Sequence, residues 1–180
     1  MTGQMMLTLA ALMLLTTSLL NFNRTMTENG ILLAQNRYRL EALSILNSHM
    51  EEASQRYFDE ASLDTLAGKN GKTLLDFTKA NDLGLEANDY GVIDDFDDYH
   101  QLTVLDTGLS GVPYKLYFEV DYVGIVSGKL KTSGNREYSK RIKAFIMDDF
   151  SDPLIYTYDG SGKVRDTLSV EYVFSYWFYN

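Results

Sequence analysis

The densest group of chemically capable side chains is the acidic run at 94–98, which is followed by Tyr99 and His100. Neighbouring carboxylates are the oxygen ligands that Ca²⁺ prefers, and that ion takes about six to eight of them. The candidate ligands are Asp94, Asp95, Asp97 and Asp98. Their spacing differs from an EF-hand loop, which has acidic residues at alternate positions, a glycine and a distal glutamate. The sequence therefore favours a solvated turn that Phe96 and Tyr99 anchor to the core, with calcium binding as the alternative.

The two histidines are the other candidates for chemistry. His49 lies on an apolar stripe of a predicted helix, where a packed or interface histidine is expected. His100 could pair with a neighbouring aspartate, but no nucleophile motif, phosphate loop or zinc motif accompanies it. The chain has no cysteine, which excludes disulfides, thiolate metal sites and a cysteine nucleophile. We expect a protein that is not an enzyme and needs no cofactor.

The length and net charge of the chain limit the number of domains and the kinds of partner that are expected. The 180 residues suffice for one globular domain with an extension. The net charge of −9 argues against a nucleic acid partner, because phosphate binding needs clustered lysine and arginine.

The amino-terminal segment 1–23 has no charged side chain, and the first charge is Arg24. Its apolar run at 5–20 would be roughly 24 Å long as a helix. The whole uncharged stretch reaches the roughly 30 Å thickness of a bilayer core. No basic residue or small-residue cleavage motif marks this segment as a secretory signal, so we expect a span whose basic leader has already been removed.

A second helical pattern follows after 21–30, where weak helix formers predict a soft joint. This amphipathic helix is predicted at 31–58. Its apolar residues form two adjoining stripes, which predicts burial on two sides, one against a sheet and one against neighbouring helices. One stripe comprises Ile31, Ala34, Tyr38, Ala42, Ile45, His49 and Ala53, and the other comprises Leu43, Leu46, Met50, Ala53 and Tyr57.

The remainder, 59–180, is predicted as a globular domain with an irregular acidic region at 59–101 and a sheet at 102–180. Apolar residues of the irregular region are expected to plug the core: Leu74, Leu75, Phe77, Leu83, Leu85 and Tyr90. Alternating apolar and polar residues predict antiparallel strands at 102–106, 114–126, 139–147, 154–158 and 167–178.

The inward-facing residues of the two central strands are predicted to be Tyr114, Leu116, Phe118, Val120 and Tyr122, then Ile142, Ala144 and Ile146. Polar turns are predicted at 128–134 and 159–162, and the aromatic end at 176–180 is expected to pack on the sheet or on a neighbouring subunit. The predicted fold is α+β: one long amino-terminal helix, hydrophobic then amphipathic, packed on a carboxyl-terminal antiparallel sheet of about four strands.

An uncharged half-helix, an amphipathic half-helix and a β-rich domain, in this order, resemble the type IV pilins and pseudopilins. The acidic element at 94–99 is similar to one found before the sheet in some pilin-like proteins. The resemblance implies removal of a leader, a methylated amino terminus, storage in the inner membrane and assembly into a helical filament. One departure stands out, because the family usually has glutamate at the fifth mature position. Here that position is Met5, or Thr8 if cleavage follows Gly3.

The sequence hypothesis is thus a structural subunit of an extracellular filament, with adhesion among the roles of such filaments. Segment 1–23 would form the filament core, 24–58 the joint and amphipathic helix, and 59–180 the outer surface. Its partners would be further copies of the chain, the inner membrane and the pilus assembly machinery. The alternatives are a membrane-anchored extracytoplasmic binding domain and a minor pseudopilin of a secretion system. The predicted assembly residues are Met5, Leu9, Leu12, Leu15, Leu19, Ile31, Ala34, Tyr38 and Ile45.

Overall fold

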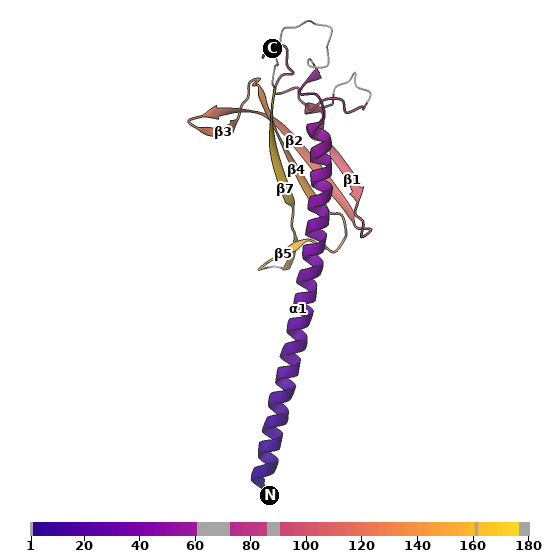
Figure 1. Ribbon diagram of the computed structural model, residues 1–180, viewed down its shortest axis with the longest axis vertical. Coiled ribbons are helices and arrows are strands. Elements are labelled where there is room, and N and C mark those ends of the chain that lie inside the picture. Colours follow the sequence, from indigo (N-terminus) through magenta and orange to yellow (C-terminus); the bar gives the residue numbers. More distant parts are fainter. Residues whose placement is uncertain (1, 61–72, 86–90, 161, 177–180) are drawn as a thin grey trace. The chain divides into compact units, whose positions relative to one another are not determined.

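The structure is a computed structural model that describes residues 2–60, 73–85, 91–160 and 162–176. It divides into two compact units, Met1–Arg39 and Leu40–Asn180, and each is described by itself. The first unit is helical, and the second combines the end of the same helix with an antiparallel sheet (Figure 1). The predicted α+β class is confirmed.

Helix α1 spans Thr2–Ser54 without a break, so the predicted soft joint at 21–30 is wrong. The weak helix formers here cost up to about 0.7 kcal/mol each relative to alanine, and Gly30 costs about 1 kcal/mol, but no proline removes a backbone donor. The hydroxyls of Thr25 and Thr27 donate back to the carbonyls four residues earlier, each at 3.0 Å. Arg24 and Glu28 also form an i,i+4 ion pair at 2.8 Å.

The part of α1 in the second unit buries a single stripe, made of Ala42, Leu46, Met50 and Ala53, all fully inaccessible. This stripe combines members of the two predicted stripes, with Ala42 from the first, Leu46 and Met50 from the second, and Ala53 from both. Helix α1 ends at Ser54, four residues before the predicted end, and Tyr57 is exposed. Polar Ser44, Asn47, Ser48 and Glu51 are exposed on the helix, so within this unit α1 is buried on one side, against the sheet. The predicted burial against neighbouring helices concerns other copies of the chain and stays a prediction.

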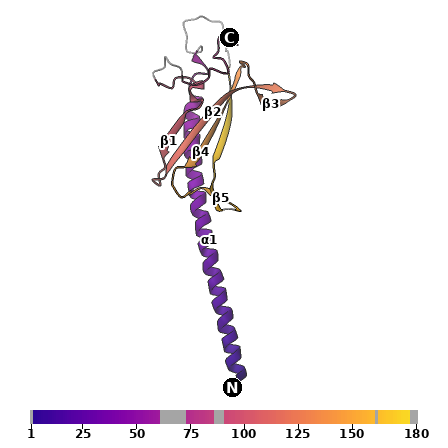
Figure 2. The same cartoon turned by 180° about the vertical axis from the view of Figure 1, so that it is seen from behind.

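The main sheet has five antiparallel strands in the order β1-β2-β4-β7, with β3 paired to the end of β2 (Figure 1). The strands are β1 Thr103–Thr107, β2 Pro113–Val126, β3 Lys129–Thr132, β4 Ser139–Asp148 and β7 Leu168–Ser175. Within the second unit, the end of α1 from Leu40 onward covers one face of the sheet, in front in Figure 1 and behind in Figure 2.

Strand β3 lies inside the predicted polar turn at 128–134 and accounts for the fifth strand. Ser127 and Gly128 both have positive φ, 55° and 74°. This conformation closes a two-residue hairpin, which brings Lys129 opposite Val126. The turn prediction missed the pairing because residues 129–132, three of them polar, are all exposed.

The core lies between α1 and the inward face of the two central strands. All five predicted inward residues of β2 and all three of β4 are fully buried, which confirms the alternation there. Among the described residues, strand β7 pairs with β4 alone in the main sheet, and its Tyr172, which alternates with polar residues in the sequence, is exposed. A strand at the sheet edge is less well covered than the centre.

The segment predicted as an edge strand at 154–158 belongs to a separate hairpin instead. Strands β5 Tyr156–Asp159 and β6 Gly162–Arg165 pair with each other, with the predicted turn between them. The Asp148 carboxylate accepts the backbone N–H groups of Leu154 and Ile155, at 3.2 and 3.0 Å. This contact turns the chain away from the main sheet and buries Ile155.

Only some of the apolar residues of the irregular region that were predicted to pack in the core are buried. Phe77 is buried and Leu74 and Leu83 are half-buried, whereas Leu75 and Leu85 are exposed and Tyr90 lies outside the described residues. The ring of Tyr176 packs on Phe58 and Phe77, with centroids 5.7 and 5.1 Å apart. This confirms intramolecular packing for the first residue of the aromatic end, and 177–180 lie outside the described residues.

Candidate functional site

Lys140 is the centre of a buried charge cluster that the sequence did not predict. It belongs to β4, where alternation places it on the same face as Ile142 and Ala144, and its side chain is fully inaccessible. Its Nζ lies 2.8 Å from Asp59 Oδ2 and 2.5 Å from Asp97 Oδ1. It also donates to the Phe58 carbonyl at 2.8 Å. A buried lysine with these partners is fully hydrogen-bonded, as a buried charge requires.

Two aromatic rings and a backbone carbonyl lie around this cluster. The Lys140 nitrogen lies 4.7 Å from the ring centroid of Phe58 and 5.2 Å from that of Tyr122. The Tyr122 hydroxyl lies 3.3 Å from Asp59 Oδ2 and 2.8 Å from the Thr78 carbonyl. Burial, with the nearby Asp59 and Asp97, raises the pKa of Tyr122 well above its ordinary value. The hydroxyl therefore stays protonated across the physiological range.

Asp59 is held in the cluster from a second direction. The backbone N–H of Thr78 donates to both of its carboxylate oxygens, at 3.0 and 3.2 Å. Its side chain is only 1% exposed. Asp59 follows the end of α1, so the cluster ties the helix end to the central strand of the sheet.

Residues 95–98 of the acidic run are buried and Asp94 is half-buried, so the predicted solvated turn is wrong. Asp95 Oδ1 accepts the N–H groups of Asp97 and Asp98, and Asp98 Oδ2 accepts those of Asp94 and Asp95, at 2.9 to 3.3 Å. The Asp95 carboxylate thereby satisfies two donors of the 3₁₀ turn Asp97–Tyr99, and within the run Lys140 pairs with Asp97. The predicted anchors Phe96 and Tyr99 are buried, which confirms that part.

The calcium hypothesis gains no support from the described residues. Within 2–60, 73–85, 91–160 and 162–176, no group of three or more histidine or acidic side chains has a metal-binding arrangement. Asp97 is bonded to Lys140, and Asp95 and Asp98 face backbone donors. Among these same residues, the buried Asp94 Oδ1 has no hydrogen-bond partner.

Asp95 makes the stability of the domain depend on pH. Burial, and then the charges of Asp97 and Asp98 against that of Lys140, raise the pKa of Asp95 to about 8 from 3.8. Burial also raises the pKa of Asp97, although Lys140 opposes it. A folded-state pKa above the unfolded value means that the folded chain binds more protons. The stabilising effect of this protonation is complete below about pH 4 and is lost as pH rises through about 8.

We therefore expect the free energy of unfolding to fall between pH 5 and pH 8, by up to about 1.4 kcal/mol per pH unit. Asp95→Asn will flatten this slope, because its amide oxygen still accepts the two N–H groups but cannot titrate. Urea unfolding at several pH values measures the effect. Asp152→Asn, at an exposed position, should leave the slope unchanged. An equal slope in wild type and Asp95→Asn would contradict the assignment.

The two histidines are structural in this fold. His49 Nε2 lies 3.2 Å from Asp106 Oδ2, and its ring meets Phe118 edge-on at 6.2 Å. This confirms a packed histidine. His100 Nδ1 accepts the N–H of Val120 at 3.0 Å. The Asp–His pair considered for His100 thus forms at His49 instead.

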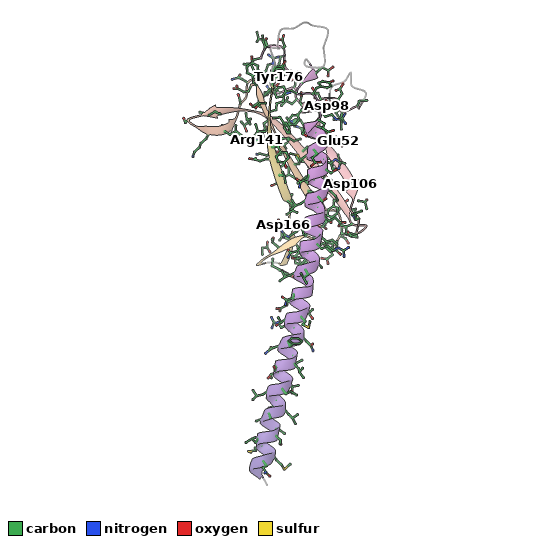
Figure 3. All side chains as sticks on the ribbon, viewed as in Figure 1. Glu52, Asp98, Asp106, Arg141, Asp166 and Tyr176 are labelled. Atoms are coloured by element: carbon green, nitrogen blue, oxygen red, sulfur yellow. The ribbon has the colours of Figure 1, made fainter. Side chains whose placement is uncertain are left out.

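The predicted assembly residues divide between the two units. Met5, Leu9, Leu12, Leu15, Leu19, Ile31 and Ala34 are exposed, and Tyr38 is half-buried. Figure 3 shows side chains on every side of this part of α1. Ile45 belongs to the second unit and is half-buried. Among the described residues, α1 is the helix long and apolar enough to cross a membrane, over Gly3–Ser54, and its most apolar window is wholly exposed.

The burial of Lys140 could have been predicted from the sequence. In an alternating strand, position 140 shares the parity of Ile142, Ala144 and Ile146, so a buried lysine could have been inferred and paired with the acidic run. Asp59 carried no comparable signal, because nothing in its surroundings distinguishes it from other acidic residues.

Comparison with known proteins found none similar to this chain. No protein family model, no curated protein and no solved structure matches the chain.

Proposed function

We propose that this chain is a structural subunit of an extracellular helical filament similar to a type IV pilus. The observation that supports this most is the exposed apolar surface of α1. Large apolar side chains from Met5 to Leu33 are exposed around the helix, and each is at least 49% accessible. Such a surface needs a lipid or protein environment, because a soluble chain rarely exposes a contiguous apolar patch of this extent.

The same surface suits two environments in turn. The 22 residues from Thr2 to Asn23 carry no charge, and as a helix they measure about 33 Å, enough for a bilayer core. A bundle of identical helices would bury the same side chains by packing against each other. The chain would thus be stored in the inner membrane, delivered by a pilus assembly machinery and incorporated with its helices in the filament core.

The exposed apolar surface of α1 ends near Leu40, which limits the contacts between copies. Leu40 is exposed, but the next outward residues are the polar Ser44, Asn47, Ser48 and Glu51. The inward stripe is already occupied by the sheet of the same chain. We therefore assign the assembly surface to residues 5–40 and assign Ile45 to its own domain.

The polar outward face of α1 also favours a second candidate, a membrane-anchored extracytoplasmic binding domain. In that case residues 44–51 would stay in water and α1 would serve as a single membrane span. The two proposals differ in whether many copies contact one another along α1.

Cysteine cross-linking tests the proposed function, because the chain has no cysteine of its own. In the variant Leu9→Cys/Leu19→Cys, each copy would carry two thiols on the apolar surface. Treatment of intact cells with a bifunctional maleimide should yield covalent oligomers longer than dimers. The matched variant Leu109→Cys/Tyr158→Cys has its thiols at exposed positions of the domain and should give a much shorter series. Monomers and dimers alone from the helix variant would contradict a filament and favour the anchored domain.

A further inference from the structure

We propose that Lys140 and Asp59 condense to a side-chain amide, an intramolecular isopeptide bond, with Asp97 as the proton relay. The bond would join the end of α1 to the central strand β4. Lys140 is on β4, Asp59 lies five residues after the last residue of α1, and Asp97 begins the 3₁₀ turn. The inference is independent of the filament proposal.

The reacting groups are already in hydrogen-bond contact. Lys140 Nζ lies 2.8 Å from Asp59 Oδ2, an oxygen bonded to the carboxyl carbon that the nitrogen would attack. Both side chains are held from several directions, Lys140 by Asp97 and the Phe58 carbonyl, and Asp59 by the Thr78 N–H. Two groups fixed in such a geometry react as if at very high concentration, because the entropy of bringing them together is already lost.

A backbone donor at Asp59 suits the charge that develops during the attack. The Thr78 N–H donates to both carboxyl oxygens of Asp59, at 3.2 and 3.0 Å. The Tyr122 hydroxyl, whose proton goes to the Thr78 carbonyl at 2.8 Å, lies 3.3 Å from Asp59 Oδ2. When the amine adds to the carboxyl carbon, negative charge builds on an oxygen of the tetrahedral intermediate. Preorganised donors in a dry site stabilise that charge.

Asp97 is placed to move the protons. Its Oδ1 lies 2.5 Å from Lys140 Nζ, on a side chain that is 3% exposed. The lysine ammonium gives one proton, through Asp97, to the Asp59 carboxylate, which leaves a neutral amine and a neutral acid. The amine nitrogen then forms its bond to the carboxyl carbon of Asp59. Asp97 takes the second nitrogen proton and passes it to the departing hydroxyl, which leaves as water.

The step balances without any other reactant. One carbon–nitrogen bond forms, one carbon–oxygen bond breaks, and one water molecule departs. The charges of Lys140 and Asp59 cancel before the reaction and vanish together in the amide, while Asp97 is regenerated. Nothing is oxidised or reduced.

Burial favours the amide over the ion pair. Lys140 and Asp59 are 0% and 1% exposed, and removing such charges from water costs more than their attraction returns unless the geometry is excellent. The neutral amine and acid are therefore more accessible here than at a surface. The Phe58 and Tyr122 rings flank the nitrogen and separate it from water, which would otherwise hydrolyse intermediates. In a chain without cysteine, this bond would provide the covalent cross-link that a disulfide provides elsewhere.

Intact mass spectrometry of the full chain purified in detergent tests the proposal. The mass should be lower than that of the linear chain by one water molecule. Trypsin should then release a branched peptide that joins residues 57–69 to 137–141, uncleaved at Lys140. The full linear mass, with cleavage after Lys140, would overturn the proposal. A mass loss with the branch at 80–115, which contains Asp97, would overturn the assignment of Asp59 as the acceptor.

Two controls make the result specific. Lys163 and Asp152 also lie 3.0 Å apart, but their side chains are 34% and 76% exposed, and they should remain unlinked in the same digest. Asp97→Asn keeps the size of the relay residue but removes its proton transfer, so we expect the linear mass to predominate. If the variant folds, as judged by circular dichroism, and still loses one water molecule, Asp97 is not the relay.

Discussion

In the proposed filament, replacing Leu12 with lysine will abolish incorporation of the chain while the β domain stays folded. Leu12 is exposed at the centre of the uncharged segment, far in sequence from either end of it. A charge at the centre of a membrane helix costs about 3 kcal/mol on insertion scales, which corresponds to roughly a hundredfold loss. The same charge repeated in every copy of a helix bundle would have no counter-ion, because the nearest acidic residue in the sequence is Glu28.

The measurement is the amount of chain in material sheared from cells, relative to the total in the cell. Leu15→Lys should behave in the same way. Leu109→Lys is the matched control, because Leu109 is a fully exposed leucine in the turn between β1 and β2. The prediction fails if Leu12→Lys reaches the sheared fraction at the level of the control.

Replacing Lys140 with methionine will destabilise the domain more than any surface substitution. The change leaves Asp59 and Asp97 buried without their cation. Breaking a buried ion pair in this way typically costs about 3–5 kcal/mol. If Lys140 and Asp59 are joined as an amide, the variant also loses that cross-link. The variant is therefore expected to be less stable than the wild type with or without the amide. Thermal unfolding of the full chain in detergent, followed by near-ultraviolet circular dichroism of its tyrosines, measures the loss.

Two further variants identify the cause of that loss. Lys163→Met removes a lysine from an exposed pair and should leave the midpoint unchanged. The triple variant Lys140→Met/Asp59→Asn/Asp97→Asn removes the uncompensated charges and should recover part of the stability. If Lys140→Met destabilises the domain no more than Lys163→Met does, the charge cluster does not contribute substantially to the stability of the domain.

The fold class could be predicted because periodicity decides it. Alternation in β2 and β4 placed their apolar residues in the core correctly, since those central strands have α1 on one face. The same rule was less accurate for β7, where Tyr172 is exposed, because an edge strand is only partly covered. Hairpin β2–β3 was missed because both positive-φ turn residues and exposed polar strands look like a loop in sequence.

The helix and the cluster show two other limits. Propensity predicted a joint at 21–30, but a few tenths of a kcal/mol per residue do not interrupt a helix that is favoured on both sides. The acidic run was interpreted as solvated because aspartates are rarely buried without partners. Its partner Lys140 lies 43 positions from Asp97 in the sequence, and only the pairing of strands brings the two together.

Electron microscopy of material sheared from cells tests the filament proposal most directly. Cells with this gene and cells in which it is deleted would be compared under identical shearing. We expect helical filaments that contain this chain and that are absent, or lack the chain, after deletion. Identical filaments in both strains, with the chain recovered only as a detergent-solubilised monomer, would contradict it.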